Sequence, residues 1–406
     1  MNTGLTEIVL NDVEVYEGAF KDCSKLTKVT VNINGNIDKA AFMNCNNLTE
    51  IDITATTIED SAFMGCAKLS TVKLTNVTSI GNRSFMGCVS LNSFVNSVVE
   101  YIGDFAFCDC KNIETLDLPA VKSIGKYAFS TSKDEQSNKL VNLVFTDSLE
   151  EIGAYAFYLS PKLTNVTVGD NLKTIGEAAF SYCSKLEEFN STSTVRVIDS
   201  YTFNNNLKLH TVKLNGINYV KEGAFFNCPE LSQIDLTNVT EIETYGFYNN
   251  TALTEANLVN LKVLGNAAFN NCTNLQSVNI PVVEVIGFQS LSFTGITEIK
   301  LPSTVTLVEA TAFTNNKNHV AIKNMDGKDT GKINDYLLLD EGVLYSVNPN
   351  GKYTLTCYPT AKENIEYEVL FNTVRIDDYA GAYNKNIKKL IFPDTLKLIG
   401  NMCFNE

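Results

Sequence analysis

The sequence predicts an α/β repeat solenoid, an elongated stack of similar units with a parallel sheet on the concave face and short helical turns on the convex face. An aromatic residue, here called the marker residue, recurs at spacings of 20 to 28 residues, and most spacings are 21 to 23. Each marker residue also stands in the same pattern of aliphatic positions. Because one such unit is too thin to bury its apolar side alone, stacked copies must share one core. The marker residues are Phe20, Phe42, Phe63, Phe85, Phe107, Phe129, Phe157, Phe180, Phe203, Phe225, Phe247, Phe269, Phe293 and Phe313.

Each unit is predicted to contain a strand, a bend, a helical turn and a return. Six residues after most marker residues stands an aliphatic residue that opens the strand, as Leu69 follows Phe63. Two more inward positions come next, such as Val72 and Leu74, and their separation by two puts both side chains on one strand face. A segment such as V-T-S-I-G at 77–81 then leads to the next marker residue.

The pattern divides the chain into a repeat array over residues 1–316, an insert over 317–373 and resumed repeats over 374–406. Within the array, the polar segment S-T-S-K-D-E-Q-S-N-K lengthens one unit, and we expect it to be an exposed loop. In the resumed part, Tyr383 and Phe404 are 21 residues apart and serve as marker residues.

The insert is predicted to contain a β-hairpin. The runs G-V-L-Y-S at 342–346 and Y-T-L-T-C-Y at 353–358 are rich in strand-forming residues. They flank N-P-N-G at 348–351, which is a strong turn signal. We expect a small β module carried by the array rather than an independent domain.

The unit L-x-x-V-x-L-x-x-V-x-x-I-G-x-x-A-F-x-x-C resembles the repeat of the BspA-like leucine-rich repeat proteins, and the resemblance covers nearly the whole chain. Ordinary leucine-rich repeats lack the Ile-Gly-x-x-Ala-Phe half. Residues 340–359 also resemble the hairpin insert of BspA-like chains. The resemblance implies a right-handed leucine-rich repeat superhelix, extracellular or on the surface of a host-associated microbe, with adhesion or partner binding as its role and no catalysis.

Charge and hydropathy exclude two classes of partner. The formal net charge is −14 and the pI is near 4.8, so the chain has no basic stripe that would attract nucleic acid or an anionic membrane. The sequence contains no run of eighteen apolar residues, so no segment is predicted to insert into a membrane, and no export signal is found at its start. Because both ends fall inside a repeat, we expect a part of a longer protein, and we expect it to be a monomer.

Eight of the 11 cysteines stand three residues after a marker residue: Cys23, Cys45, Cys66, Cys88, Cys110, Cys183, Cys228 and Cys272. Asn takes the same position at 206, 250 and 316, which favours a small buried side chain near backbone groups. The spacing matches no zinc site. Stacked positions could still come within disulfide range, so both free structural thiols and some pairing stay open.

Other motifs give no catalytic, cofactor or metal site. His210 and His319 accompany no nucleophile motif, and His210 occupies a strand position held by Thr or Ser in other units. The segment D-G-K-D-T-G-K-I at 326–333 lacks the spacing of a phosphate loop or an EF-hand, so we interpret it as a turn. Eight Asn-x-Ser/Thr sequons are either glycan acceptors or by-products of a repeat rich in Asn and Thr.

The first candidate binding surface is the outward side of the predicted sheet. Its residues are small, polar or charged and include no aromatic anchor of the kind that strong protein interfaces use. The surface is either a solvated face or a face that binds weakly through many repeats. Its charged members, which are our candidate binding residues here, are Asp52, Lys73, Asp117, Lys213, Asp235 and Lys300; the uncharged ones are Thr30, Val95, Val144, Thr167, Asn190, Asn257 and Asn279.

The second candidate surface is a group of aromatic residues next to the marker residues of the central units. They either cover the grooves between neighbouring turns or form a contact site, and on the second interpretation four tyrosines are candidate binding residues. These are Tyr127, Tyr155, Tyr201 and Tyr245, accompanied by Phe105, Tyr158, Phe226 and Tyr248.

We therefore expect a non-enzymatic cell-surface or secreted protein that binds a host protein or glycan, for example in the extracellular matrix. The alternative is a structural spacer that presents another domain of a longer surface protein. A third hypothesis, a glycan-acting enzyme using Asp52 or Asp117, is weak because carboxylates spaced along a rigid sheet do not by themselves make an acid and a nucleophile.

Overall fold

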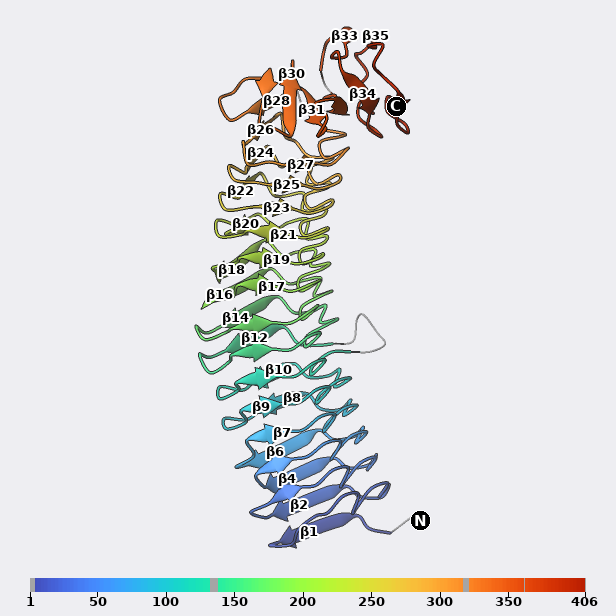
Figure 1. Cartoon of the computed structure of the whole chain (residues 1–406). Helices are drawn as coiled ribbons and strands as arrows, with labels where there is room; N and C mark the ends of the chain where they lie inside the picture. Colours follow the sequence, from blue (N-terminus) through green and yellow to red (C-terminus); the bar gives the residue numbers. More distant parts are fainter. Residues whose placement is uncertain (1–3, 132–137, 317–320, 361, 406) are drawn as a thin grey trace. The chain divides into compact units, whose positions relative to one another are not determined.

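A computed structural model describes residues 4–131, 138–316, 321–360 and 362–405. They form two compact units, Met1–Asn215 (unit 1) and Gly216–Glu406 (unit 2), a division that falls inside the predicted array. In each unit, the strands of successive repeats lie side by side (Figure 1).

Each repeat contributes a long strand to a parallel sheet, as predicted. The inward positions align from repeat to repeat. Val29, Ile51 and Val72 lie side by side in register; Val29 and Ile51 are buried and Val72 is half-buried. The long strands of unit 1 are β1 (Glu7–Asn11), β2 (Lys28–Asn32), β4 (Glu50–Thr54), β6 (Thr71–Thr75), β8 (Ser93–Val95), β10 (Thr115–Asp117), β12 (Asn142–Phe145), β14 (Asn165–Val168), β16 (Glu188–Thr194) and β18 (Thr211–Asn215). Those of unit 2 are β20 (Gln233–Ile234), β22 (Glu255–Asn257), β24 (Ser277–Asn279), β26 (Glu298–Leu301) and β28 (Ala321–Asn324).

A second parallel sheet, which the sequence analysis missed, is built from two-residue strands just before the Gly of the Ile-Gly motif. Its buried residues are aliphatic, as at Ile80, which pairs with Ile58 and Ile102. In unit 1 the short strands are β3 (Asn36–Ile37), β5 (Thr57–Ile58), β7 (Ser79–Ile80), β9 (Tyr101–Ile102), β11 (Ser123–Ile124), β13 (Glu151–Ile152), β15 (Thr174–Ile175) and β17 (Val197–Ile198). In unit 2 they are β19 (Tyr219–Val220), β21 (Glu241–Ile242), β23 (Val263–Leu264), β25 (Val285–Ile286) and β27 (Leu307–Val308).

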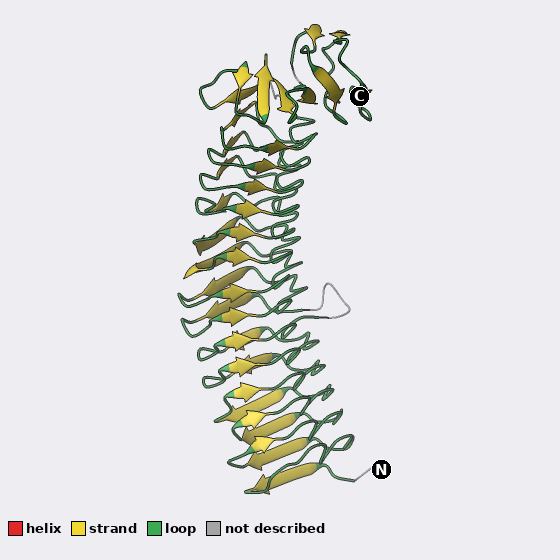
Figure 2. Cartoon of the chain, in the orientation of Figure 1, coloured by secondary structure: helices red, strands yellow, loops and turns green. Residues whose placement is uncertain are grey.

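The predicted helical turns are wrong: the described residues contain strands and turns but no helix (Figure 2). Around the marker residue Phe42, Ala40 has a left-handed φ of 54°. The N–H of Phe42 then donates to Ala62 O of the next repeat, at 2.8 Å, instead of to a carbonyl four residues earlier. Inter-repeat hydrogen bonds therefore replace the helix. It follows that no described segment is a helix able to cross a membrane.

The marker residues form the centre of the core, as predicted. In unit 1 the rings of neighbouring repeats stack with centroids 5.2 Å apart for Phe20 and Phe42, and the same stacking continues to Phe203. In unit 2, Phe225, Phe247 and Phe269 stack in the same way. The aliphatic and aromatic side chains of each unit thus merge into one continuous interior.

Two predicted marker residues are reassigned by the structure. Leu291 is buried and donates its N–H to Ala312 O, as other marker residues do, whereas Phe293 is 44% exposed. Likewise Gly381, not Tyr383, holds the marker position, and the Phe404 ring occupies the space that a Cβ of Gly381 would take. With Leu291 as the marker residue, the spacings on either side of it both become 22.

All 11 cysteines are buried free thiols. In several repeats the side chain three residues after the marker residue donates to the carbonyl of the preceding marker residue, whereas the buried amide of Asn206 has no hydrogen-bond partner among the described residues. Cys45 donates to Phe20 O at 3.2 Å, and Asn250 donates to Phe225 O at 2.7 Å. The thiol of Cys and the amide of Asn can both donate to this backbone carbonyl, which explains why the two residues interchange at this position.

Burial of these thiols predicts a loss of stability in alkali. Burial raises the pKa of Cys183 from its ordinary value of 9.0 to about 12. Between those two values the unfolded chain ionises this thiol and the folded chain does not, so rising pH favours unfolding by about 1.4 kcal/mol per pH unit per thiol. We expect urea unfolding midpoints to fall above pH 9, and to fall less steeply in Cys183→Ser. Serine suits this site because Ser160 holds the equivalent position in the preceding repeat. Equal pH dependence of the two proteins would contradict this.

The predicted hairpin is confirmed, with Val347 paired to Tyr353 across the turn. It belongs to an antiparallel sheet of β29 (Gly331–Lys332), β30 (Leu337–Asp340), β31 (Val343–Val347) and β32 (Tyr353–Cys357). The next strand, β34 (Thr373–Ile376), pairs with β32 in parallel and with β36 (Leu398–Ile399), while β33 (Glu366–Glu368) pairs with β35 (Lys389–Ile391). Tyr358 occupies a marker position, because its N–H donates to Ala380 O, so the repeats resume before the predicted boundary at residue 374.

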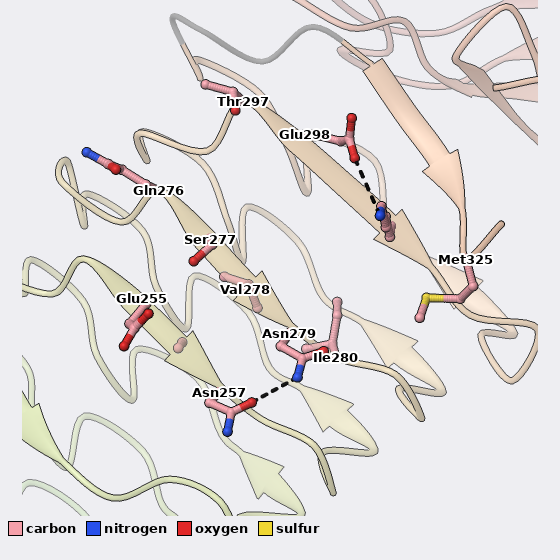
Figure 3. Close-up of a pocket in the computed structure, with 12 residues that line it drawn as sticks. Glu255, Asn257, Gln276, Ser277, Val278, Asn279, Ile280, Thr297, Glu298 and Met325 are labelled. Atoms are coloured by element: carbon pink, nitrogen blue, oxygen red, sulfur yellow. Dashed lines mark hydrogen bonds and ion pairs between the residues drawn. The ribbon is translucent and has the colours of Figure 1, made fainter. Parts of the chain in front are cut away.

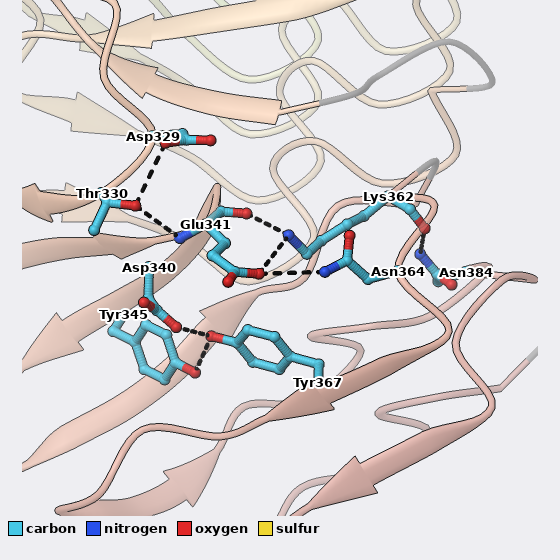
Figure 4. Close-up of polar contacts among 9 residues, drawn as sticks. All are labelled: Asp329, Thr330, Asp340, Glu341, Tyr345, Lys362, Asn364, Tyr367 and Asn384. Carbon is cyan, nitrogen blue, oxygen red and sulfur yellow. Dashed lines mark hydrogen bonds and ion pairs between the residues drawn. The ribbon is translucent and has the colours of Figure 1, made fainter.

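Buried polar contacts join the hairpin strands to the repeats that resume at Tyr358 (Figure 4). Tyr367 donates to Asp340 at 2.7 Å and its hydroxyl lies 2.7 Å from that of Tyr345. Lys362, which is buried, contacts the carbonyl and carboxylate of Glu341. Burial raises the pKa of Tyr367 well above its usual range, so it stays a hydrogen-bond donor.

Candidate binding site

The outward side chains of the long strands, here called the sheet face, lie in the rows that the sequence predicts. Thr30, Asp52 and Lys73 are in register across β2, β4 and β6. Asp117 lies beside Val95. The same alignment joins Val144, Thr167, Asn190 and Lys213 in unit 1, and Asn257 to Asn279 in unit 2.

The structure brings some of the predicted charges together and leaves others apart. Lys73 forms an ion pair with Asp52 at 2.8 Å, which leaves this part of the row without net charge. Asp117 and Lys213 are exposed and lie on different strands of unit 1. In unit 2, the hydroxyl and the N–H of Thr237 both donate to Asp235, and these bonds lower the pKa of its carboxyl.

A groove of about 570 Å³ lies on the sheet face of unit 2, across β22, β24 and β26 (Figure 3). It is lined mainly by carboxylate, amide and hydroxyl groups, including Glu255, Gln276, Ser277 and Asn279, and Met325 stands beyond β26. Its size lies within the range of about 300–1,000 Å³ that is typical of ligand sites.

The groove coincides with one of several interruptions in the ladder of long strands. Among the described strands, β24 pairs with β22 and β26 pairs with β28, but no ladder joins β24 to β26. The connection before β26 is one residue short, because the buried Ile296 follows the marker residue Leu291 by five positions, whereas Leu275 follows Phe269 by six. The outward side chains on the two sides of the interruption form the walls of the groove.

Charge within the groove is partly paired. Glu298 contacts Lys323 at 2.5 Å and Lys300, the predicted binding residue, at 4.0 Å. Asn279 donates to Asn257 at 2.8 Å, so the two amides are oriented with respect to each other (Figure 3). Glu255 is exposed at the groove wall. The arrangement offers hydrogen-bond donors and acceptors together with positive and negative charges.

Sequence reasoning found Lys300, Asn257 and Asn279 but missed Glu255, Ser277 and Glu298. These three lie two residues earlier on the same strands and therefore on the same face. Because side chains alternate between the two faces of a strand, the sequence was sufficient to find them. Met325 follows β28, whose place beside β26 no sequence pattern indicated.

The predicted aromatic residues lie on the side of the turns. In unit 1, Tyr127 stacks between Phe105 and Tyr155, with centroid distances of 4.9 and 4.5 Å. Arg83 lies over the outer face of Phe105 at 5.1 Å, and Tyr155 donates to Glu177 at 2.6 Å. The ring faces are therefore largely covered by neighbours, and mainly ring edges and hydroxyls reach solvent.

In unit 2, Tyr245 is 40% exposed and packs edge-on against Phe226 and Tyr248. Tyr201 in unit 1 is half-buried, as are Tyr127 and Tyr155. In both units, rings of neighbouring turns stack on one another. His210 is half-buried and contacts Thr211 through its Nδ1, while His319 lies outside the described residues.

The BspA type leucine rich repeat region model matches residues 13–136, 100–219, 135–254, 214–320 and 358–406, with six copies. The chain belongs to this family. The BspA-type match thus covers the array and the resumed repeats, and it begins again at Tyr358, where the structure places a marker residue.

One solved structure supports the leucine-rich repeat solenoid fold. A leucine-rich repeat protein of Bacteroides ovatus is 22% identical over 78% of this chain and 92% of its own, with a TM-score of 0.56. A leucine rich cell surface protein of Faecalibacterium prausnitzii is 22% identical over 70% of this chain, with a TM-score of 0.46, and the match spans 62% of that protein. The pneumococcal vaccine antigen PcpA is 19% identical over 78% of this chain and 87% of its own, with a TM-score of 0.46. No curated protein sequence matches the chain.

Proposed function

We propose that this BspA-type protein is a non-enzymatic, cell-surface or secreted binding protein whose sheet face contacts a host protein or glycan. The observation that carries the proposal is the groove across β22, β24 and β26, where exposed polar side chains converge at an interruption of the sheet. Polar, hydrogen-bonding walls without aromatic anchors fit a hydrophilic partner that is held through several repeats.

The ionisable side chains of the groove are few and partly paired. They are Glu255, Glu298 and Lys300, and Glu298 is engaged by two lysines. No His, Cys, Asp or Glu cluster of three or more that could hold a metal occurs among the described residues.

We expect Ser277→Ala combined with Asn279→Ala to weaken partner binding at least tenfold, which corresponds to about 1.4 kcal/mol. Both side chains are exposed, so folding should be unchanged. The matched control is Asn165→Ala with Thr167→Ala, at the first and third positions of strand β14 in unit 1. The measurement is binding of the full chain to immobilised fibronectin, fibrinogen, collagen, laminin and a glycan array.

Equal loss of binding in the groove variant and in the β14 control would contradict a site at the groove. Absence of binding to the whole panel would favour the second function, a spacer that presents another domain. That function is supported by the regular stacking of marker residues from Phe20 to Phe203, which repeats one packing arrangement through unit 1.

A further inference from the structure

A second cavity, distinct from the groove, lies on the turn side of unit 2 at the place where the insert interrupts the array. It has a volume of about 470 Å³ and its walls include Phe293, Asn315, Tyr383, Lys385 and Asn386. Thr360 closes one side, and its hydroxyl donates to Asn316 O at 3.1 Å across the interruption.

Phe293 and Tyr383 occupy an unusual position for aromatic residues. Both stand two residues after a marker position, with φ of 57° and 64°. In most repeats this left-handed position holds Asn, Asp or Gly, which tolerate it, whereas bulky side chains are outliers there. Among the described residues, Tyr182 is the remaining aromatic residue at this position.

The packing of unit 2 does not account for these two rings. Phe293 is 44% exposed and Tyr383 is 38% exposed. Phe293 also interrupts a row of hydrogen-bonded amides, because Asn271 donates to Asn249 at 2.6 Å, Asn249 donates to Asn227 at 2.6 Å, and Phe293 stands at the next position of the row. An Asn at 293 would continue the row toward Asn315, so the fold alone favours Asn at this position.

The cavity combines two exposed aromatic rings with amides and one charge. Lys385 is the one ionisable group besides the Tyr383 hydroxyl among its described walls, and it has no ion-pair partner among the described residues. This is a local positive charge on a chain whose formal net charge is −14. The aromatic faces suit the C–H faces of a sugar ring, the amides suit its hydroxyls, and the ammonium group suits a carboxylate.

We propose that this cavity binds a sugar ring that carries a carboxylate, the chemical class of sialic and uronic acids. Phe293 and Tyr383 pack against the ring and Lys385 pairs with its carboxylate. The site lies on the side of the turns, so its occupancy is independent of the groove on the sheet face.

The probes are 3′-sialyllactose, a glucuronic acid-containing disaccharide and, as the neutral reference, lactose, each titrated into the full chain by calorimetry or ligand-observed NMR. We expect at least one acidic sugar to bind at least tenfold more tightly than lactose, and the two acidic probes tell the two sources apart. Phe293→Asn and Tyr383→Asn should each weaken binding at least tenfold, and Lys385→Gln should abolish the preference for the acidic sugar. Tyr182→Asn, the same replacement at the same repeat position in unit 1, should leave binding unchanged.

Thermal unfolding separates a binding role from a packing role. Because Asn suits the left-handed position, Phe293→Asn should melt at the same temperature as the natural chain or at a higher one. A clearly lower melting temperature would make Phe293 a packing residue and overturn the proposal. It would also be overturned if neither acidic sugar binds, if lactose binds as tightly as they do, or if Lys385→Gln leaves the preference intact.

Discussion

Replacing Phe247 with alanine is expected to lower the free energy of unfolding of unit 2 by about 3–5 kcal/mol. Phe247 is fully buried, and its ring stacks between Phe225 and Phe269 with centroid distances of 5.0 and 5.1 Å. The substitution removes apolar burial and both ring contacts, and the neighbouring repeats are held by their own inter-repeat hydrogen bonds, so the cavity cannot readily collapse.

The matched control for this prediction is Phe293→Ala in the same unit. The sequence pattern alone marks both residues as equivalent, but Phe293 is 44% exposed and Leu291 fills its expected place in the core. We therefore expect a change below about 1 kcal/mol for Phe293→Ala. Chemical denaturation of the two variants and the natural chain measures the difference, and equal destabilisation would show that the reassignment of the marker residue is wrong.

The inward positions were predictable because the repeat gives the same information many times. One unit with Leu69, Val72 and Leu74 is ambiguous between a strand and other structures, but the same spacing in unit after unit allows only a stack of parallel strands. The register of Thr30, Asp52 and Lys73 follows from that alignment without further assumptions.

The second sheet and the absence of helices were harder to predict for local reasons. A strand of two residues, such as Ser79–Ile80, is too short to show an alternating pattern. The turn residues were misassigned because residues such as Tyr127, with φ of 56°, are large aromatics that ordinarily avoid the left-handed region. Only the inter-repeat hydrogen bonds, which the sequence does not display, make that conformation the stable one.

The two cavities depend on departures from the repeat rather than on the repeat itself. At the groove, a connection that is one residue short precedes β26, and this shortening was visible once Ile296 was recognised as buried. At the turn-side cavity, the sequence pattern predicted the wrong marker residues. Phe293 and Tyr383 are aromatic like the other marker residues but lie two positions after the true ones. Irregular units of a repeat protein are thus where sequence reasoning is weakest and where its candidate sites lie.

The Ile-Gly motif supports the second prediction with a large effect. Gly125→Ala should lower the free energy of unfolding of unit 1 by about 3 kcal/mol, the upper part of the usual range for overpacking. A Cβ at Gly125 would lie 2.5 Å from the carbonyl carbon of Gly103 and 2.7 Å from the backbone N of Asp104. Both atoms belong to the backbone of the preceding repeat, so no side-chain rotation relieves the contact.

The control is Gly35→Ala in the same unit, where a Cβ would meet no heavy atom within 4 Å. Its φ is not left-handed, so alanine should be neutral or should stabilise unit 1 by up to about 1 kcal/mol, because it restricts the unfolded chain. Urea unfolding of both variants, followed by circular dichroism, tests the pair. If Gly125→Ala were as harmless as Gly35→Ala, the backbones of neighbouring repeats could separate at the short strands, and the close approach that makes glycine necessary in the motif would not be a requirement of the fold.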